Sequence, residues 1–504
     1  MSLRHNVATT YASQIYVTLL SLAVMPIYLR YMGSEAYGLV GFFTMLQAWF
    51  QILDMGLGPA LSRDIARQRA GAIPIQELRV LFSALENIFI LIAVLGAVAL
   101  TLTAPYVASH WIKTHVLSTE SVAASVLMMG LTIPLRWIAG LYRSVIAGHE
   151  RMAWLAGFNA AGATARFPGA LLVLELWSKL PTTFFAFQLF VAVLEFVILA
   201  AISHRLLPRH SRASWREQLM QVRRLGSFSL MIAATAVIWI TVTQVDKLLL
   251  SHLLTLSDYG YFSLAIVVAG GVNLLAAPIS QALLPTLARL HAKEDHAALI
   301  ATYRKSSQLT CLITIPCALM LSFFPEQILF AWINDINAAH KAAPIIAGYA
   351  IGNAILAISA FPYLLQYARG SLRLHLLGNL LLVMILVPAI IWISPEYGAV
   401  GAAGVWLAAI TLYFLVWVTL SHAKLEPGLH GPWVYDIARI AGASLLTTAL
   451  LHSLVTWPQG RLSSVATVLA IWLAATITGA LSANDPTARR LILKALALTR
   501  HHSR

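Results

Sequence analysis

The chain has 504 residues, of which 59% are hydrophobic and only 11% carry a formal charge, and its formal net charge is +14. Soluble domains carry roughly 25% charged residues, so a chain of this composition cannot cover itself with polar surface, and most soluble functions are excluded. No module interleaves basic and aromatic residues, which argues against nucleic acid as a partner, whereas basic loops beside anionic lipid explain the positive charge.

Fourteen apolar segments follow one another along the chain and leave little room for a soluble domain. A spanning helix needs about 20 apolar residues, and most of these segments reach that length. The sequence therefore predicts an all-α polytopic membrane protein with 14 transmembrane helices. The predicted spans cover residues 9–30, 37–59, 80–102, 119–142, 153–176, 183–203, 226–250, 260–286, 307–324, 343–367, 375–394, 399–421, 434–456 and 462–482.

The basic residues are distributed unevenly between the gaps that separate these spans. Of the 34 Lys and Arg residues, 25 lie at the two ends and in alternate gaps, five lie in the intervening gaps and four lie inside spans. Lys and Arg are enriched in the cytoplasmic loops of membrane proteins, so this alternation predicts that both termini are cytoplasmic. The gap between the sixth and seventh spans holds Arg205, Arg209, Arg212, Arg216, Arg223 and Arg224.

A short motif recurs at three outer connections between spans. Residues 34–38 read SEAYG, residues 257–260 read SDYG, and residues 394–398 read SPEYG. The equivalence of the first and seventh spans indicates two six-helix units with two spans appended, and parallel six-span repeats are typical of transporters. The predicted domains are an N-terminal six-helix bundle (1–205), a basic cytoplasmic linker (206–225), a C-terminal six-helix bundle (226–422), and two additional helices with a basic cytoplasmic tail (423–504).

Charged residues inside the spans are the main candidates for function, because a charge within the membrane is costly and seldom kept without a role. The basic candidates for substrate binding are Arg30, Arg136, Arg166 and Lys247. Arginine grips phosphate with a planar fork, so a basic pair would attract a phosphate-bearing or acidic ligand. An equally open interpretation is that Arg136 and Arg166 pair with Glu195 or Asp54 as structural links.

The acidic candidates for carrying a coupling ion are Asp54, Glu195 and Asp246. A buried carboxyl can hold a proton, although structural carboxylates look the same in a sequence. Asp246 and Lys247 are adjacent and point about 100° apart on a helix, so they need not pair with each other.

Several classes of protein lack support in the sequence. There is no Walker-type glycine loop for an ATP-driven pump, no nucleophile elbow, and no histidine pair with zinc-site spacing. Cys311 and Cys317 lie on different faces of one apolar helix, which indicates inert thiols and neither a disulfide nor a metal pair. The first apolar stretch has no small-residue cleavage site and is expected to be a retained helix. We therefore expect no enzymatic activity, no cofactor and no metal.

Specific segments of the chain resemble a known family. Residues 26–33 read PIYLRYMG, residues 54–58 read DMGLG ahead of Arg63, residues 244–247 read QVDK, and residues 259–261 read YGY. In order and spacing these resemble the Wzx-type O-antigen flippases, the polysaccharide-exporter branch of the multidrug/oligosaccharidyl-lipid/polysaccharide flippase superfamily. The likeness extends over the whole chain in length, span count and topology, and its motifs are concentrated in residues 14–65 and 240–262.

The resemblance implies two six-helix bundles in a V-shaped arrangement plus two C-terminal helices. It also implies alternating access that moves an undecaprenyl-pyrophosphate-linked oligosaccharide from the inner to the outer leaflet of a bacterial inner membrane, for O-antigen or exopolysaccharide synthesis, with ion coupling. The expected partners are the lipid-linked oligosaccharide, the bilayer, a polysaccharide polymerase and a chain-length regulator. By position, Arg30, Arg136, Arg166 and Lys247 would then form a cationic cavity.

Other functions stay open at this stage. A lipid II flippase of the same superfamily also has fourteen spans, whereas a drug/cation transporter usually has twelve and an acidic lumen. A membrane glycan-assembly enzyme usually carries a substantial outer loop, and no predicted outer loop here exceeds about 20 residues. A non-catalytic scaffold would have little use for charges deep in the spans.

Overall fold

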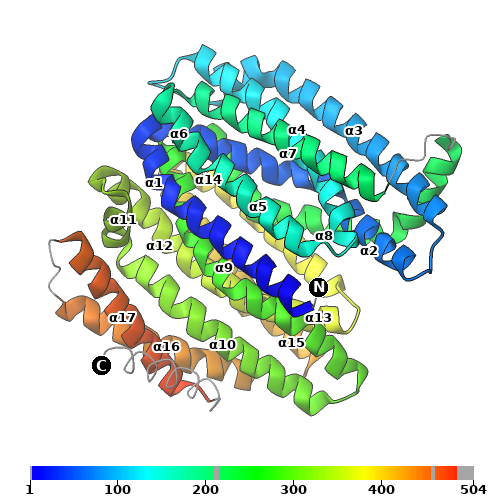
Figure 1. Cartoon of the computed structure of the whole chain (residues 1–504). Coiled ribbons are helices and arrows are strands. Elements are labelled where there is room, and N and C mark those ends of the chain that lie inside the picture. Colours follow the sequence, from blue (N-terminus) through cyan, green and yellow to red (C-terminus); the bar gives the residue numbers. More distant parts are fainter. Residues whose placement is uncertain (1–2, 208–214, 456–459, 485–504) are drawn as a thin grey trace, which may run out of the picture. The chain divides into compact units, whose positions relative to one another are not determined.

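The computed structural model describes residues 3–207, 215–455 and 460–484, and nearly all of these residues lie in helices. Eleven helical stretches of these residues are long and apolar enough to cross a membrane (Figure 1). The prediction of an all-α, multi-pass membrane protein is therefore confirmed.

Two compact units divide the chain, Met1–Gly260 and Tyr261–Arg504. Much of the predicted linker and tail, including Arg209, Arg212, Arg489, Arg490, Lys494, Arg500 and Arg504, lies outside the described residues. The predicted domain boundaries stay a prediction.

In the first unit the elements are α1 (Leu3–Phe50), η1 (Gln51–Asp54), α2 (Leu57–Arg69), α3 (Ile75–Tyr106), η2 (Val107–Trp111), α4 (Thr119–Gly148), α5 (Met152–Arg166), α6 (Pro168–Leu176), α7 (Pro181–Leu206), α8 (Trp215–Leu253) and the start of α9 (Leu256–Ala292). The second unit continues with α10 (His296–Phe323), α11 (Pro325–Ile333), α12 (Ile336–Ser359), α13 (Phe361–Ala368), α14 (Arg373–Leu412), η3 (Tyr413–Val418), α15 (Thr419–Leu425), α16 (His430–Leu454) and α17 (Arg461–Ser482).

Two apolar stretches are much longer than one membrane crossing needs. They run from Ala8 to Asp54 and from Arg373 to Leu425, 47 and 53 residues, against about 20 for a spanning helix. Each contains a glycine with a backbone that other residues rarely adopt: Gly33 at φ 83° and Gly398 at φ 58°. At Gly33 the two arms of α1 turn back on each other (Figure 1). The second stretch contains two predicted spans, and the first contains the span 9–30 and most of the span 37–59, which ends in the structure at the turn after Asp54.

A third difference from the predicted spans lies at residues 153–176, which form α5 and α6 with a break at Phe167. Pro168 opens α6, where its missing N–H is harmless because the first N–H groups of a helix lack partners anyway. Neither short helix is long enough to span a membrane alone.

Each unit has its own hydrophobic core. In the first unit α3, α4 and α7 pack around buried Phe82, Phe89, Trp137 and Tyr142, with Phe89 stacked on Trp137 at 4.4 Å between ring centroids. In the second unit α10, α12 and α16 contribute to a core that the rings of Tyr303, Phe361 and Trp433 fill.

The first two copies of the recurring motif pack against each other in the first unit. The Oγ atoms of Ser34 and Ser257 are 2.7 Å apart. A Cβ atom on Gly38 would lie 2.2 Å from the carbonyl oxygen of Leu256, and one on Gly260 would lie 2.3 Å from that of Ser34. Glycine is therefore required at both positions for close helix contact. The third copy, in the second unit, differs because its bend falls at its own last residue, Gly398.

Glu35, the second residue of the first motif, anchors the connection that precedes α4. Its carboxylate is 5% exposed and accepts hydrogen bonds from the backbone N–H groups of His115, Val116 and Leu117 and from the Thr114 hydroxyl, all at 2.8–3.1 Å. A carboxylate is thus the natural partner for a concave set of N–H groups.

We expect Glu35→Ala to lower the free energy of unfolding by about 2 kcal/mol, because it leaves buried N–H donors without an acceptor. Thermal unfolding of the detergent-solubilised protein would measure the change. The matched control is Glu120→Ala, an exposed acidic residue in the first turn of α4, which should change stability little. Equal effects of the two substitutions would contradict the anchoring role.

Candidate functional site

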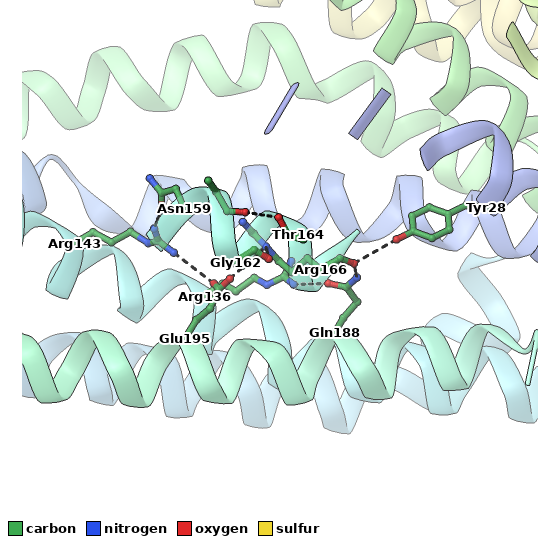
Figure 2. Close-up of polar contacts among 10 residues, drawn as sticks. Tyr28, Arg136, Arg143, Asn159, Gly162, Thr164, Arg166, Gln188 and Glu195 are labelled. Atoms are coloured by element: carbon green, nitrogen blue, oxygen red, sulfur yellow. Dashed lines mark hydrogen bonds and ion pairs between the residues drawn. The ribbon is translucent and has the colours of Figure 1, made fainter. Parts of the chain in front are cut away.

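Three helices of the first unit each place two polar side chains seven residues apart. Seven residues are close to two helical turns, so the members of each pair lie on one face, about 10.5 Å apart along the axis. The pairs are Arg136 and Arg143 on α4, Asn159 and Arg166 on α5, and Gln188 and Glu195 on α7. These helices pack together, and the six side chains meet in one place, which we call the arginine cluster (Figure 2).

Arg136 and Gln188 form the first layer of the cluster. Nη2 of Arg136 donates to Oε1 of Gln188 at 2.6 Å, and the guanidinium lies 5.3 Å from the ring centre of Phe43 on α1. The amide of Gln188 in turn donates to the backbone carbonyl of Arg166 at 2.9 Å. A neutral amide thus holds Arg136 in place and leaves its charge uncompensated in this layer.

Glu195 forms the second layer with two arginines. Its carboxylate is 3.4 Å from Nη2 of Arg143 and 3.3 Å from Nε of Arg166. Arg143 also donates to the side-chain oxygen of Asn159. Gly162 makes room for the carboxylate, because a Cβ atom there would lie 2.5 Å from Oε1 of Glu195. Glu195 is therefore the shared counter-ion of Arg143 and Arg166.

The break between α5 and α6 lies beside this cluster. Pro168 has no N–H to donate back into α5, and side chains from other helices donate to carbonyl groups at the break. The Tyr28 hydroxyl donates to the carbonyl of Phe167 at 2.9 Å, and Gln188 serves that of Arg166 (Figure 2). Broken helices at membrane depth occur where they are buried in protein or line a cavity.

The charges within the cluster do not balance. The cluster holds three guanidinium groups and one carboxylate, which pairs with two of them and whose side chain is only 7% exposed. Arg136 interacts electrostatically with Arg166, Glu195 and Arg143, and its buried Nε has no hydrogen-bond partner among the described residues. An arrangement with excess positive charge and an unused donor can bind an anionic group, and the planar fork of arginine suits phosphate.

The structure brings together three of the residues that the sequence singles out, namely Arg136, Arg166 and Glu195. The predicted pairing of Arg166 with Glu195 is present, and Arg136 bonds to an amide instead of a carboxylate. Sequence reasoning missed Arg143, because the predicted span ended at residue 142 whereas α4 continues to Gly148. It also missed the neutral partners of the arginines. The repeated spacing of seven was the signal that could have identified all six.

Lys247 and Asp246 lie on α8, which packs against α1 and α3. Nζ of Lys247 is 3.3 Å from the Asp246 carboxylate, and it also donates to the carbonyl of Thr243 one turn earlier. The two neighbours therefore pair in the structure although they point about 100° apart, because the long lysine side chain folds back along its own helix. Asp246 is 1% exposed.

Asp54 and Arg30 occupy separate positions in the first unit. Asp54 ends η1 and accepts from the N–H of Gly58 at 3.3 Å, in the first turn of α2. Met55 and Gly56 between them have positive φ, so the DMGLG segment is the turn between two helices. Arg30 is exposed on α1, two residues after Tyr28. The roles of these residues in binding and coupling stay predictions.

Comparison with known proteins shows which family the sequence matches and which solved structures have a similar fold. A family model described as polysaccharide biosynthesis protein matches residues 3–291, more than half of the chain. No protein in a search of curated sequences matches.

Several solved structures share the fold at low sequence identity. A structure of the lipid II flippase MurJ, in an inward closed conformation, has a TM-score of 0.72 and 15% identity, covering 94% of this chain and 97% of that chain. An inward-facing multidrug resistance MATE family transporter of the MOP superfamily has a TM-score of 0.64 and 13% identity, covering 82% and 95%. A MOP superfamily transporter from Pyrococcus furiosus has a TM-score of 0.54 and 15% identity, covering 84% and 95%. The chain therefore belongs to the polysaccharide biosynthesis protein family, and it shares its fold with the MurJ and MATE structures.

Proposed function

We propose that the protein is a flippase that moves an undecaprenyl-pyrophosphate-linked oligosaccharide repeat unit from the inner to the outer leaflet of a bacterial inner membrane. It works by alternating access, with both termini in the cytoplasm and fourteen spans in total. The eleven long apolar stretches support this span number in the following way. Each of the two bent stretches provides two spans, which gives thirteen, and α5 together with α6 provides the fourteenth. The product serves O-antigen or exopolysaccharide synthesis.

The observation that carries the proposal is the excess positive charge of the arginine cluster. A pyrophosphate is the part of such a substrate that is hardest to move through lipid, because it carries concentrated negative charge. Arg136, Arg143 and Arg166 offer donors for it in the arginine cluster, and Arg166 lies next to the break between α5 and α6. Arg30 and Lys247 are further positions on its path in this proposal, and Asp54, Glu195 and Asp246 are candidates for ion coupling.

A lipid II flippase is the strongest alternative, since lipid II also carries a pyrophosphate and the MurJ structure shares the fold. The cluster does not distinguish the two cargoes, because it would contact the pyrophosphate that both share. A drug/cation transporter fits the cluster poorly, because three arginines against one carboxylate repel cations. No enzymatic role is proposed.

Binding of undecaprenyl pyrophosphate to the purified full-length protein tests the proposal. We expect it to raise the thermal unfolding temperature far more than undecaprenol, which has the same tail without phosphate. Arg136→Gln should weaken this binding about tenfold to a hundredfold, the usual worth of one charge-assisted hydrogen bond. Surface polysaccharide in cells carrying this variant should fall while the protein still inserts.

Arg439→Gln is the matched control. Arg439 lies on α16 in the second unit, where it contacts Asn484 and the ring of Tyr435, away from the cluster in sequence and partners. This variant should bind undecaprenyl pyrophosphate like the unchanged protein. Equal stabilisation by undecaprenyl pyrophosphate and undecaprenol would refute the proposed function.

A further inference from the structure

A chain of hydrogen bonds connects three elements of the second unit through two histidines. The Tyr303 hydroxyl on α10 is 2.6 Å from Nε2 of His422 on α15. Nδ1 of His422 is 3.0 Å from Nδ1 of His430, the first residue of α16. Nε2 of His430 is 3.1 Å from the Thr419 hydroxyl. Tyr303 and His422 are fully buried, whereas His430 is only partly buried.

The donors in this chain point in one direction. The Thr419 hydroxyl donates its proton to the carbonyl of Leu415 at 2.6 Å, so its oxygen must accept from Nε2–H of His430. The opposite nitrogen of His430 is then an acceptor, and Nδ1–H of His422 is the donor to it. Nε2 of His422 accepts from the Tyr303 hydroxyl, which has no other hydrogen-bond partner among the described residues. Every donor and acceptor is satisfied when both rings are neutral.

An additional proton has no place in this arrangement. A proton on Nδ1 of His430 would face the Nδ1–H of His422, and a proton on Nε2 of His422 would face the hydroxyl of Tyr303. An added proton therefore leaves one donor without an acceptor: either the two Nδ1–H groups face each other, or His422 donates to the Tyr303 oxygen and the tyrosine hydroxyl hydrogen has no acceptor among the described residues. The indole of Trp433 and the ring of Phe361 pack against the buried end, where Tyr303 and His422 are 0% exposed.

The charged groups on the neighbouring elements are engaged with one another. Arg304, next to Tyr303, contacts the Asp436 carboxylate on α16 at 2.7 Å. Glu426, after α15, pairs with Arg369 and with His296 at 3.2 Å. Neither carboxylate therefore has its charge free to stabilise an imidazolium. Other titratable side chains on these packed elements are Lys305, Cys311, Cys317, Tyr363, Tyr367, Tyr413, Lys424, Tyr435, Arg439 and His452.

We propose that His422 and His430 form a proton-binding site of the second unit, and that a bound proton releases the start of α16 from α10 and α15. The proton enters through His430, the partly exposed ring, and reaches His422 next. When these hydrogen bonds are broken (the open form), the two imidazoles titrate near pH 6.5, their ordinary value. When the hydrogen bonds are intact (the closed form), they exclude the proton. The free energy that favours the closed form over the open form is therefore fully present above that pH and decreases as the pH falls below it. This site is independent of the proposed cargo.

Amide hydrogen exchange of the full-length protein at pH 8 and pH 5.5 tests the proposal. After correction for the intrinsic exchange rate, residues 419–435 should exchange about tenfold faster at the lower pH, the effect of losing about one net hydrogen bond. The double variant His422→Gln/His430→Gln should lose this pH response. His452→Gln is the control, because His452 lies on α16 like His430 but contacts Phe323 and Phe324 and takes no part in these hydrogen bonds. It should keep the full response.

Tyr303→Phe gives a second measurement that does not depend on the double variant being folded. It removes the hydroxyl that occupies Nε2 of His422, so the midpoint of the pH response should move to higher pH. A purely structural role would instead speed exchange equally at both pH values. An unshifted midpoint in Tyr303→Phe, or a full pH response in the double variant, overturns the proposal.

Discussion

Glu195→Ala is expected to lower the free energy of unfolding of the protein by about 3 kcal/mol, the usual consequence of removing one partner from a buried ion pair. The carboxylate is 7% exposed and is the shared counter-ion of Arg143 and Arg166. Without it, the three guanidinium groups repel one another with no carboxylate between them, and the side chains of Arg143 and Arg166 are only 28% and 23% exposed. Thermal or denaturant unfolding of the detergent-solubilised protein, followed by circular dichroism, would measure the loss.

The matched control for this prediction is Glu150→Ala. Glu150 also pairs with an arginine, Arg69 at 3.1 Å, but its side chain is 73% exposed. Exposed pairs contribute about 0–1 kcal/mol, so this variant should unfold almost like the unchanged protein. If Glu195→Ala were as harmless as the control, Arg143 and Arg166 would have to be hydrated, and the cluster would not be a desolvated anion site.

Glu195→Ala and Arg136→Gln separate the two interpretations of the buried arginines. Arg166 and Arg143 are paired with Glu195, so a large part of their role is structural. Arg136 is held by Gln188 and has no carboxylate within the distance of an ion pair among the described residues. Its loss should therefore weaken ligand binding more than it weakens folding. The sequence left these interpretations open because it shows charges and not their partners.

The all-α, multi-pass character of the protein could be predicted from the length of its apolar segments, whereas the fourteen predicted spans compare with eleven long apolar helical stretches among the described residues. The boundaries could not be predicted, since helices continue beyond the apolar region wherever local sequence permits. Arg143 shows the consequence: it follows the apolar stretch, yet it lies in α4 and faces Glu195. The split at Phe167 was signalled by Pro168, but one proline does not say whether a helix bends or breaks.

The partners within the site could be predicted only in part. Arg166 and Glu195 were recognisable as costly charges, whereas Gln188 and Asn159 are neutral and common in helices. The histidine chain was also hidden, because His422 and His430 are separated by a turn whose geometry depends on Gly428 at φ 91°. Hydrogen-bond networks of this kind follow from packing, which composition and spacing do not encode.

The closest helix contact of the first unit leads to the second large prediction. Gly38→Ala and Gly260→Ala should each lower the free energy of unfolding by about 3 kcal/mol, at the upper end for added volume in a packed interior. The new methyl group would lie 2.2 Å from the Leu256 carbonyl oxygen in one case and 2.3 Å from that of Ser34 in the other. Backbone atoms within helices cannot move aside as a side-chain end can. Unfolding of the purified variants, and their yield in the membrane, would measure the effect.

Gly270→Ala is the control, because Gly270 lies on α9 like Gly260 but nothing is within 4 Å of the added Cβ atom. Alanine favours helix over glycine, so this variant should be unchanged or more stable by up to about 1 kcal/mol. The two damaging substitutions act on one contact, since residues 34–38 and 256–260 face each other. Once one methyl group has separated the helices, the second meets less resistance, so the double variant should lose less than the sum of the two. Strict additivity would mean that the two glycines serve independent contacts, and the packing of the two motifs would need another explanation.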